Sequence, residues 1–241
     1  MTAGSSKYLI GLIALNTVVF AVIAISGLFV ADFTRSAVTV LCLSDSIDAL
    51  LDRPWTILSY TLVQGNILQL LFNMLWLFGF GRLMLMRCSV RQMLGLYVAG
   101  TILGGALYIA FFSLSSPGTH GLLMGSSASV IAVATTVAFI MPDSEVYIPL
   151  LGPTKIKWVV IVVVALFCIG LSAPNSGGNL AHIGGAIAGA AYGMKIRRDE
   201  MSADSKHSAE YDRLVGKIKS SGYDSMTAKE KRRFFELSRK R

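Results

Sequence analysis

Ser127 and His182 are the two residues of this chain whose types and setting could support nucleophilic chemistry. Ser127 stands at the beginning of the apolar segment 126–141, directly after Gly125 and Ser126. Of the three histidines, His182 is the one that lies within an apolar segment. A serine hydroxyl becomes an effective nucleophile when a base takes its proton, and histidine is the most frequent base in this role. The pair therefore predicts a serine–histidine dyad that could attack a carbonyl carbon.

The sequence offers no acidic residue to complete a triad with this pair. The first acid after Ser127 is Asp143, 16 residues further on, which is roughly 24 Å along a helix. We therefore expect helix packing to orient the His182 ring. The three cysteines and three histidines form no metal-binding pattern, and no glycine-rich phosphate loop is present in the sequence. The predicted chemistry thus uses no metal and no cofactor.

The composition indicates a membrane protein. Of the 241 residues, 54% are hydrophobic and 15% are charged, whereas about a quarter of a typical soluble domain is charged. Six apolar segments have the character of transmembrane helices. These segments are 8–30, 66–86, 92–114, 126–141, 157–172 and 179–196. We therefore predict an all-α membrane protein, in which residues 1–196 form a six-helix bundle and residues 197–241 form a tail.

The basic residues predict how the bundle is oriented. The net charge is +8, and 14 of the 22 lysine and arginine residues lie in the segment 195–241. Most of the others fall in loops on the same predicted side, against only Arg35 and Arg53 on the opposite side. Cytoplasmic loops are enriched in positive residues, so both termini are predicted to be cytoplasmic. The concentrated charge fits contact with membrane lipids, and no nucleic-acid partner is expected.

Two segments lie outside the predicted transmembrane helices. Residues 31–60 mix charged and apolar side chains, which predicts a loop with an amphipathic helix at the membrane interface and Trp55 as an aromatic anchor. The tail is predicted to contain two short helices, with Thr227 and Glu230 as a capping box for the second. Two roles for the tail remain open, a solvated or lipid-surface segment and a small docking module.

Four polar side chains are predicted to lie at a similar depth in the membrane. The second, fourth and sixth helices run in the same direction, and their N-terminal ends carry Gln69, Asn73, Ser127 and His182. Polar groups inside a membrane usually face the protein interior or a cavity, and they often mark function. The fourth helix, at roughly 24 Å, is shorter than the roughly 30 Å of hydrocarbon. Ser127 is therefore expected below the surface, with first-turn N–H groups available to an oxyanion.

Small residues predict close packing of the fourth helix against the sixth. The stripe on the sixth helix begins with His182 and continues with Gly185, Gly189 and Gly193. The matching stripe on the fourth helix consists of Ser127, Ile131, Ala134 and Ala138. Small side chains let two helix backbones approach closely, and Gly125, just before the fourth helix, is interpreted as a helix-packing residue together with Gly185 and Gly189. Packing these stripes together would bring the serine hydroxyl to the histidine ring.

The motifs around these residues resemble those of the rhomboid intramembrane serine proteases. They are Gly125-Ser126-Ser127 as the family's Gly-x-Ser, the stretch 181–185 with Gly189, and the stretch 71–76 around Asn73. The resemblance covers all six predicted helices and is to the six-span bacterial type, which implies a bacterial inner membrane. It implies that Ser127, activated by His182, hydrolyses a peptide bond in or beside a substrate's transmembrane helix. It also implies that the Ser127 backbone N–H and the Asn73 side chain bind the oxyanion.

The sequence departs from the family pattern at several positions. Gln69 stands where many members have a histidine that assists the oxyanion hole, and a glutamine amide can donate the same bond. Ala128 replaces a glycine that often follows the nucleophile, and Ile131 stands where an aromatic ring can stack on the histidine. Thr56 takes the place of an arginine beside Trp55. These departures motivate an alternative, a rhomboid-like protein that binds transmembrane helices without cleaving them, although the retained dyad favours the enzyme.

The other polar residues have structural interpretations. Ser126 and Ser129 are interpreted as helix-packing residues. The two amides of the second helix could each be no more than an interhelical hydrogen bond. His120, in the loop before the serine turn, and His207, in the tail, are interpreted as solvated residues. A transporter is disfavoured, because His182 is the one ionisable residue deep in a predicted transmembrane helix.

Overall fold

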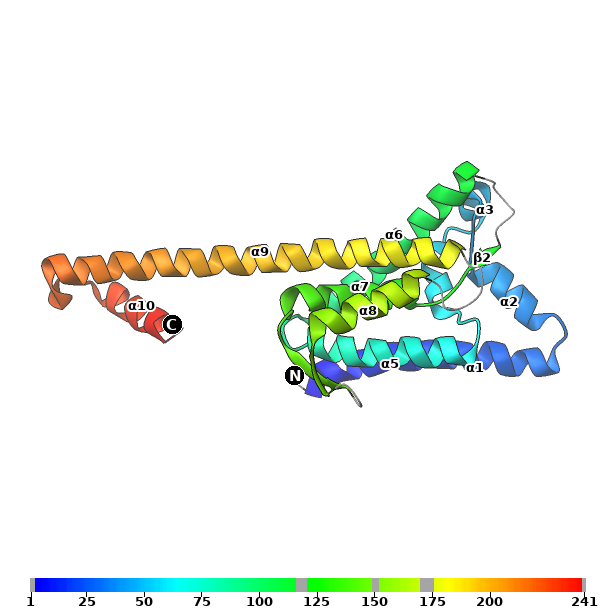
Figure 1. Ribbon diagram of the computed structural model, residues 1–241, viewed down its shortest axis with the longest axis horizontal. Coiled ribbons are helices and arrows are strands. Elements are labelled where there is room, and N and C mark those ends of the chain that lie inside the picture. The colour runs from blue at the N-terminus through cyan, green and yellow to red at the C-terminus, as the bar shows by residue number, and fades with distance from the viewer. Residues whose placement is uncertain (1–2, 116–120, 149–151, 170–175, 240–241) are drawn as a thin grey trace. The chain divides into compact units, whose positions relative to one another are not determined.

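The structure is a computed structural model that describes residues 3–115, 121–148, 152–169 and 176–239. The chain is built mainly of α-helices, and each of the six predicted segments has a corresponding helix (Figure 1). These helices are α1 (Ala3–Phe29), α5 (Ile67–Met84), α6 (Val90–Ser115), α7 (Ser127–Ile140), α8 (Ile156–Ile169) and α9 (Ser176–Ser221). The prediction of an all-α, membrane-type fold is confirmed.

Contacts divide the chain into two compact units, Met1–Met194 and Lys195–Arg241. The division falls within α9, which continues without a break to Ser221. The prediction that the tail begins with a separate short helix is therefore wrong. The physical reason lies in the segment 194–215, which contains no glycine and no proline that would end a helix.

Within the part of the chain that the structure describes, three helices have the length and composition to cross a membrane, namely Ser6–Phe29, Ile67–Met84 and Val90–Leu114. Two other apolar helical stretches are shorter, Ser127–Ile140 and Ile156–Leu166. The 14 residues of α7 extend over about 21 Å, which is less than the roughly 30 Å of a bilayer's hydrocarbon core. The helix that begins at Ser127 is thus short, as the sequence predicted.

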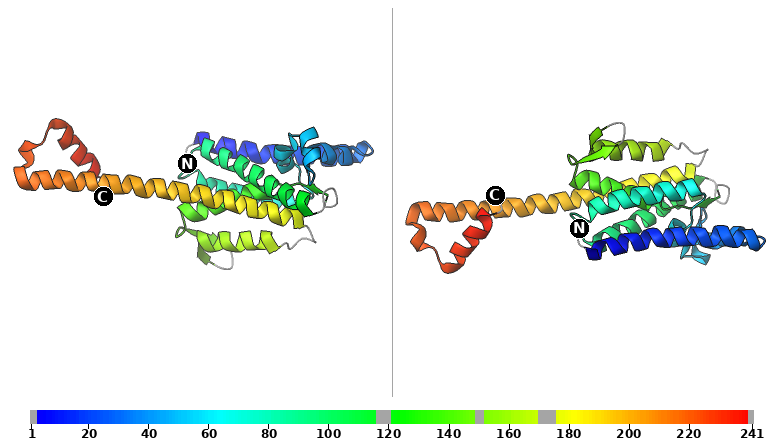
Figure 2. Two further views of the ribbon diagram at one scale, coloured as in Figure 1. Left: turned by 90° about the horizontal axis from the view of Figure 1, so that it is seen from above. Right: turned by 90° about the horizontal axis from the view of Figure 1, so that it is seen from below.

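The central element of the first unit is α7. It packs against α5, α6 and α8, and Figure 2 shows the helices of this unit side by side. Residues on all of its faces are buried. A helix surrounded by other helices has no solvated face, which explains why α7 contains no charged residue and is mostly apolar.

The segment between α1 and α5 is more helical than predicted. Instead of a loop with one interfacial helix, it contains α2 (Phe33–Leu41), α3 (Ile47–Asp52), α4 (Thr56–Ser59) and the 3-10 helix η1 (Tyr60–Leu62). Trp55 fixes this segment internally, because its indole N–H donates to the carbonyl of Val40 at 2.8 Å. Short helices such as these are held by such tertiary contacts, since their length alone gives little stability.

Two small antiparallel ladders flank α7. Strand β1 (Leu43–Ser44) pairs with β2 (Leu122–Leu123), and so ties the segment after α2 to the chain that leads into α7. Strands β3 (Glu145–Ile148) and β4 (Gly152–Lys155) form a second ladder between α7 and α8. The first ladder fixes the chain shortly before Ser127.

The second unit pairs the C-terminal part of α9 with α10 (Ala228–Ser238) through the 3-10 helix η2 (Tyr223–Ser225). Its buried apolar residues are Leu214, Met226 and Leu237. The predicted capping box is confirmed, because the Thr227 hydroxyl accepts from the backbone N–H of Glu230 while the Glu230 carboxylate accepts from the backbone N–H of Thr227. The tail is therefore a compact helical unit.

Candidate active site

The hydroxyl oxygen of Ser127 lies 2.8 Å from Nε2 of His182. Ser127 is the first residue of α7 and is buried, and His182 lies near the start of α9 and is half-buried. The distance is that of a hydrogen bond. With its proton on Nδ1, the imidazole presents Nε2 as an acceptor for the hydroxyl proton. The pair can therefore act as nucleophile and base.

The turn before α7 delivers Ser127 to this position. Gly125 has a φ of +113°, a left-handed conformation that favours glycine. A Cβ at Gly125 would stand 2.4 Å from Nε2 of Gln69, so the turn lies directly against this amide. The backbone N–H of Gly125 donates to the Tyr60 carbonyl at 3.0 Å. Gly125 precedes α7 and forms this turn, so it is not one of the residues by which α7 packs against α9.

The glycines of α9 bring His182 close to α7. A Cβ at Gly185 would stand 2.1 Å from the carbonyl oxygen of Ala128, and one at Gly189 would stand 2.4 Å from that of Ala132. The hydroxyl of Thr136 also donates to the Gly189 carbonyl at 2.9 Å. Both glycines thus lie where predicted, on the face of α9 that contacts α7.

The partner face on α7 differs from the one predicted. The stripe was expected to consist of Ser127, Ile131, Ala134 and Ala138. The glycines instead meet the residues one position later in each turn, Ala128, Ala132, Thr135 and Phe139. One residue is a rotation of about 100°, and α7 has no polar face that would have fixed its rotation in the sequence. The small side chains of Ala128 and Ala132 permit the contact.

Helix α6 completes this close packing with two glycines that the sequence analysis missed. A Cβ at Gly104 would stand 2.9 Å from the Cβ of Ala128, and one at Gly100 would stand 2.7 Å from that of Ala132. A Cβ at Gly184 would in turn stand 2.7 Å from the backbone of Gly104. The spacing of four between the two α6 glycines was the available signal.

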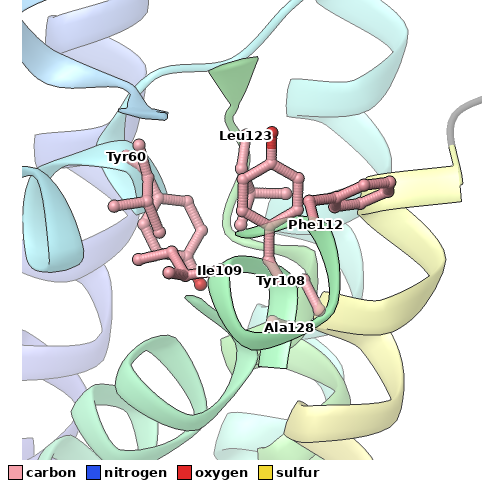
Figure 3. Packing of buried hydrophobic residues seen from close by; sticks show 8 residues of the cluster. Tyr60, Tyr108, Ile109, Phe112, Leu123 and Ala128 are labelled. Carbon is pink, nitrogen blue, oxygen red and sulfur yellow. The ribbon is translucent and has the colours of Figure 1, made fainter. Parts of the chain in front are cut away.

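A hydrophobic cluster includes a chain neighbour of each member of the dyad, and Figure 3 shows its side chains. Ala128 follows Ser127 in the chain, and Ala181 precedes His182. The cluster consists of these two alanines together with Leu43, Tyr60, Tyr108, Ile109, Phe112 and Leu123. Both tyrosine hydroxyls of the cluster are hydrogen-bonded: Tyr60 donates to the Thr101 carbonyl and Tyr108 donates to the Gly121 carbonyl. This packing holds the chain next to both members of the dyad.

Polar side chains gather around Ser126, the residue before Ser127. We call this group the buried polar cluster, and its members are Asn16, Thr61, Gln64, Asn73, Tyr97, Thr101, Ser126 and Ser129. Ser126 accepts from Gln64 at 3.1 Å, and Ser129 shares a hydrogen bond of 2.6 Å with Thr101. The two serines that were interpreted as packing residues thus join α7 to other elements through side-chain hydrogen bonds.

The two amides predicted as oxyanion donors lie beside the serine turn. Gln69 accepts from the backbone N–H of Gly65 at 2.7 Å, and its Nε2 lies 3.5 Å from the Met124 carbonyl. Asn73 donates to Gln64 at 2.9 Å. Within the described part of the chain, neither amide is hydrogen-bonded to Ser127. The structure therefore brings Gln69 to the Gly125 turn and joins Asn73 to Ser126 through Gln64.

Gln64 and Asn16 were not predicted as site residues from the sequence. Asn16 is a polar residue in the middle of the first apolar segment, and Gln64 lies in the short stretch between the 3-10 helix and α5. A buried amide inside an apolar segment was the available signal for Asn16. The sequence did not indicate that Gln64 is buried, because Gln64 falls outside every predicted helix.

Two histidines remain besides His182. His120 falls outside the described residues, and His207 is half-buried on α9 in the second unit. Among the residues that the structure describes, no group of three histidine, cysteine, aspartate or glutamate side chains could hold a metal ion.

Comparison with known proteins gives one family match. The sequence model of the Rhomboid domain matches residues 51–199, which is more than half of the chain. The matched region includes Ser127, His182, Asn73, Gln69 and Gln64. We found no curated protein that the sequence matches.

Proposed function

The chain belongs to the rhomboid family, and from this membership we propose that it is an intramembrane serine endopeptidase. Its substrates would be membrane proteins, cut in or next to a transmembrane helix. The observation that carries the proposal is the 2.8 Å contact between the Ser127 hydroxyl and Nε2 of His182. A protein that only bound transmembrane helices would require neither the nucleophile nor the base.

The proposed reaction follows the general course of a serine hydrolase. The Ser127 oxygen attacks the scissile carbonyl carbon, and its proton passes to Nε2 of His182. As the C–N bond breaks, the imidazolium returns this proton to the leaving amine nitrogen. Water then attacks the acyl-enzyme, with His182 again acting as base, and releases the carboxylic acid and free Ser127.

The negative charge that develops on the carbonyl oxygen requires hydrogen-bond donors. Ser127 is the first residue of α7, and the N–H groups of a first helical turn have no partner within the helix. We propose that the Ser127 N–H binds the oxyanion together with the side-chain amides of Asn73 and Gln69. The contacts of these amides with Gln64 and with the Met124–Gly125 turn support this role.

Location and organisation complete the proposal. The family and the apolar helices indicate an integral membrane protein. We propose that it lies in a bacterial inner membrane with both termini in the cytoplasm, where the basic residues of 197–241 would face anionic lipid headgroups. Residues 1–196 would carry the protease, surrounded by lipid and by substrate helices.

Cleavage of a generic transmembrane substrate tests the proposal. Full-length wild type, Ser127→Ala and His182→Ala are reconstituted in liposomes with the substrate, and the products are separated on a gel. Wild type is expected to cleave, and both variants are expected to lose cleavage. Cleavage by Ser127→Ala at the wild-type rate would exclude the dyad mechanism.

One observation favours a second candidate, a rhomboid-fold protein that binds transmembrane helices without cutting them. The amide of Gln69 is already engaged with Gly65 on one side and lies near the Met124 carbonyl on the other. Such a protein would retain the intact substrate. Photo-crosslinking of an uncut substrate helix to wild-type protein, with no product over hours, would support this candidate.

A further inference from the structure

Gln64 is the centre of the hydrogen bonds next to the dyad. Its Oε1 accepts from Nδ2 of Asn73 at 2.9 Å. Its Nε2 faces three oxygens, those of the Ser126 hydroxyl at 3.1 Å, the Thr61 carbonyl at 3.2 Å and the Asn16 side chain at 3.3 Å. Gln64, Asn73 and Ser126 are all more than nine-tenths buried. Bulk water therefore does not replace these bonds.

The neighbours of Gln64 determine which end of its amide points to Asn73. The Thr61 backbone carbonyl can only accept, so it requires the nitrogen of Gln64 on its side. The Asn16 side chain, for an independent reason, also requires the nitrogen of Gln64 on its side. Its own nitrogen donates to the Leu12 carbonyl at 2.9 Å, which leaves its oxygen facing Gln64. Two backbone carbonyls thus fix the Gln64 amide with its oxygen toward Asn73.

The orientation of Gln64 in turn fixes Asn73. Because Gln64 presents an acceptor, Asn73 must present its nitrogen. The oxygen of Asn73 is buried and has no hydrogen-bond partner among the described residues. Gln64 is therefore the contact that decides which end of the Asn73 amide is the donor. Without it, a flipped Asn73 would offer a lone pair where an oxyanion needs an N–H group.

We propose that Gln64 is a positioning residue that holds Asn73 in its donor orientation. The bond from Gln64 to Ser126 keeps the Gln64 amide in a fixed position relative to the turn that carries Ser127. The proposal rests on the proposed function, since it assigns a purpose to the orientation of a proposed oxyanion donor. Gln64 itself does not touch the reacting atoms; it acts through Asn73.

The test is a double-mutant cycle in the full-length protein, with a fluorogenic transmembrane substrate in liposomes. Gln64→Met keeps a similar volume but removes the acceptor. We expect it to lower kcat by about tenfold to a hundredfold with little change in KM, because it misplaces a group used only in the transition state. Asn73→Ala should lower kcat by a similar or larger factor. The double variant should be no slower than Asn73→Ala alone.

Thr101→Val is the matched control for loss of a buried polar contact. Thr101 belongs to the same buried polar cluster and bonds Ser129, but among the described residues no hydrogen bond joins it to Asn73. It is expected to lower the thermal midpoint while kcat stays at the wild-type value. If Gln64→Met does not yield folded protein, Gln64→Asn takes its place, because it keeps an amide in the cluster but is shorter by one methylene. Gln64→Asn should lower kcat in the same direction.

Three outcomes would overturn the proposal. In the first, the Gln64 variants have wild-type kcat while Ser127→Ala is inactive and Asn73→Ala is slow, so that the dyad stands and the positioning role fails. In the second, the effects of Gln64→Met and Asn73→Ala multiply in the double variant, which indicates independent roles. In the third, wild type and Ser127→Ala do not differ, so that the proposed function fails and the positioning role fails with it.

Discussion

The backbone of Gly185 lies so close to Ala128 that a Cβ at residue 185 would stand 2.1 Å from the Ala128 carbonyl oxygen. Gly185 is one helical turn from His182, and Ala128 is adjacent to Ser127. The distance between the two helix backbones therefore sets the distance between the base and the nucleophile.

This contact predicts that Gly185→Ala moves α9 away from α7 and lengthens the distance between the Ser127 hydroxyl and the His182 ring. A displacement of about 1 Å can cost about a hundredfold in rate, so we expect a loss of that order in kcat/KM. Gly95→Ala on α6 is the matched control, because a Cβ there meets no atom within 4 Å, and it should retain wild-type activity. Wild-type cleavage by Gly185→Ala would contradict the role given to this contact.

The second prediction concerns the nucleophile. A fluorophosphonate probe is expected to modify Ser127 and no other serine, because among the described residues Ser127 is the serine whose hydroxyl is bonded to a histidine nitrogen. Peptide mapping by mass spectrometry identifies the modified residue, and His182→Ala should suppress the modification. Modification of Ser126 or Ser129 instead would refute the assignment.

The third prediction concerns the oxyanion donors. Removing one donor typically lowers the rate by about 10²–10³. Asn73→Ala and Gln69→Ala are expected to lower kcat more than they raise KM, and the Ser127 N–H should leave measurable activity. Gln69→His should be tolerated, since a histidine can also donate. If both alanine variants keep wild-type kcat in folded protein of unchanged thermal stability, the two amides are packing contacts only.

The fourth prediction concerns metal dependence. Ser127 and His182 supply the nucleophile and the base between them, so cleavage is expected to persist in EDTA. The measurement compares initial rates with and without the chelator. Loss of activity that zinc restores would require a different mechanism.

The fifth prediction concerns the tail at acidic pH. Hydrogen bonds from Lys217 lower the pKa of the Glu230 carboxyl from its usual 4.5 to about 2. A lowered pKa in the folded state means that this carboxylate stabilises the tail above about pH 4.5 and loses its effect as the pH falls toward 2. Glu230→Gln should exchange amide hydrogens in α10 faster than wild type at pH 6. The difference between the two proteins, measured at matched pH, should vanish near pH 2.

A difference that persists unchanged at low pH would show that the carboxylate charge is not responsible. Lys231→Gln is the control variant. Its ammonium pairs with the exposed carboxylate of Asp224 rather than with Glu230, so it should leave the exchange of α10 close to wild type.

Membrane topology, motif spacing and helical periodicity together paired Ser127 with His182, and periodicity placed Gly185 and Gly189 on the face of α9 that contacts α7. It was not sufficient to fix the rotation of α7, because an apolar helix buried on every side carries no stripe to read. The contact with Ala128 therefore emerged only from the packing. In the tail, the capping box of Thr227 and Glu230 was predicted correctly, because it depends only on two residues three positions apart.

The buried polar cluster could not be predicted in the same way. Gln64 bonds Asn16, 48 residues earlier, and Ser126, 62 residues later. Such pairings depend on how three separate elements meet, and periodicity within one segment contains no information about them. Of the three amide side chains in the cluster, only Asn73 was singled out from the sequence, because it lies in a motif.

The order of the chain has a consequence for biosynthesis. Ser127 and His182 are 55 residues apart, and α9, which carries the histidine, follows α8. Because a polypeptide is made from its N-terminus, the serine is synthesised before its base. On the proposed mechanism, the nascent chain stays inert toward neighbouring membrane proteins until α9 has docked. A ribosome-stalled or truncated product that ends in α8 would lack His182 and would therefore not cleave neighbouring membrane proteins.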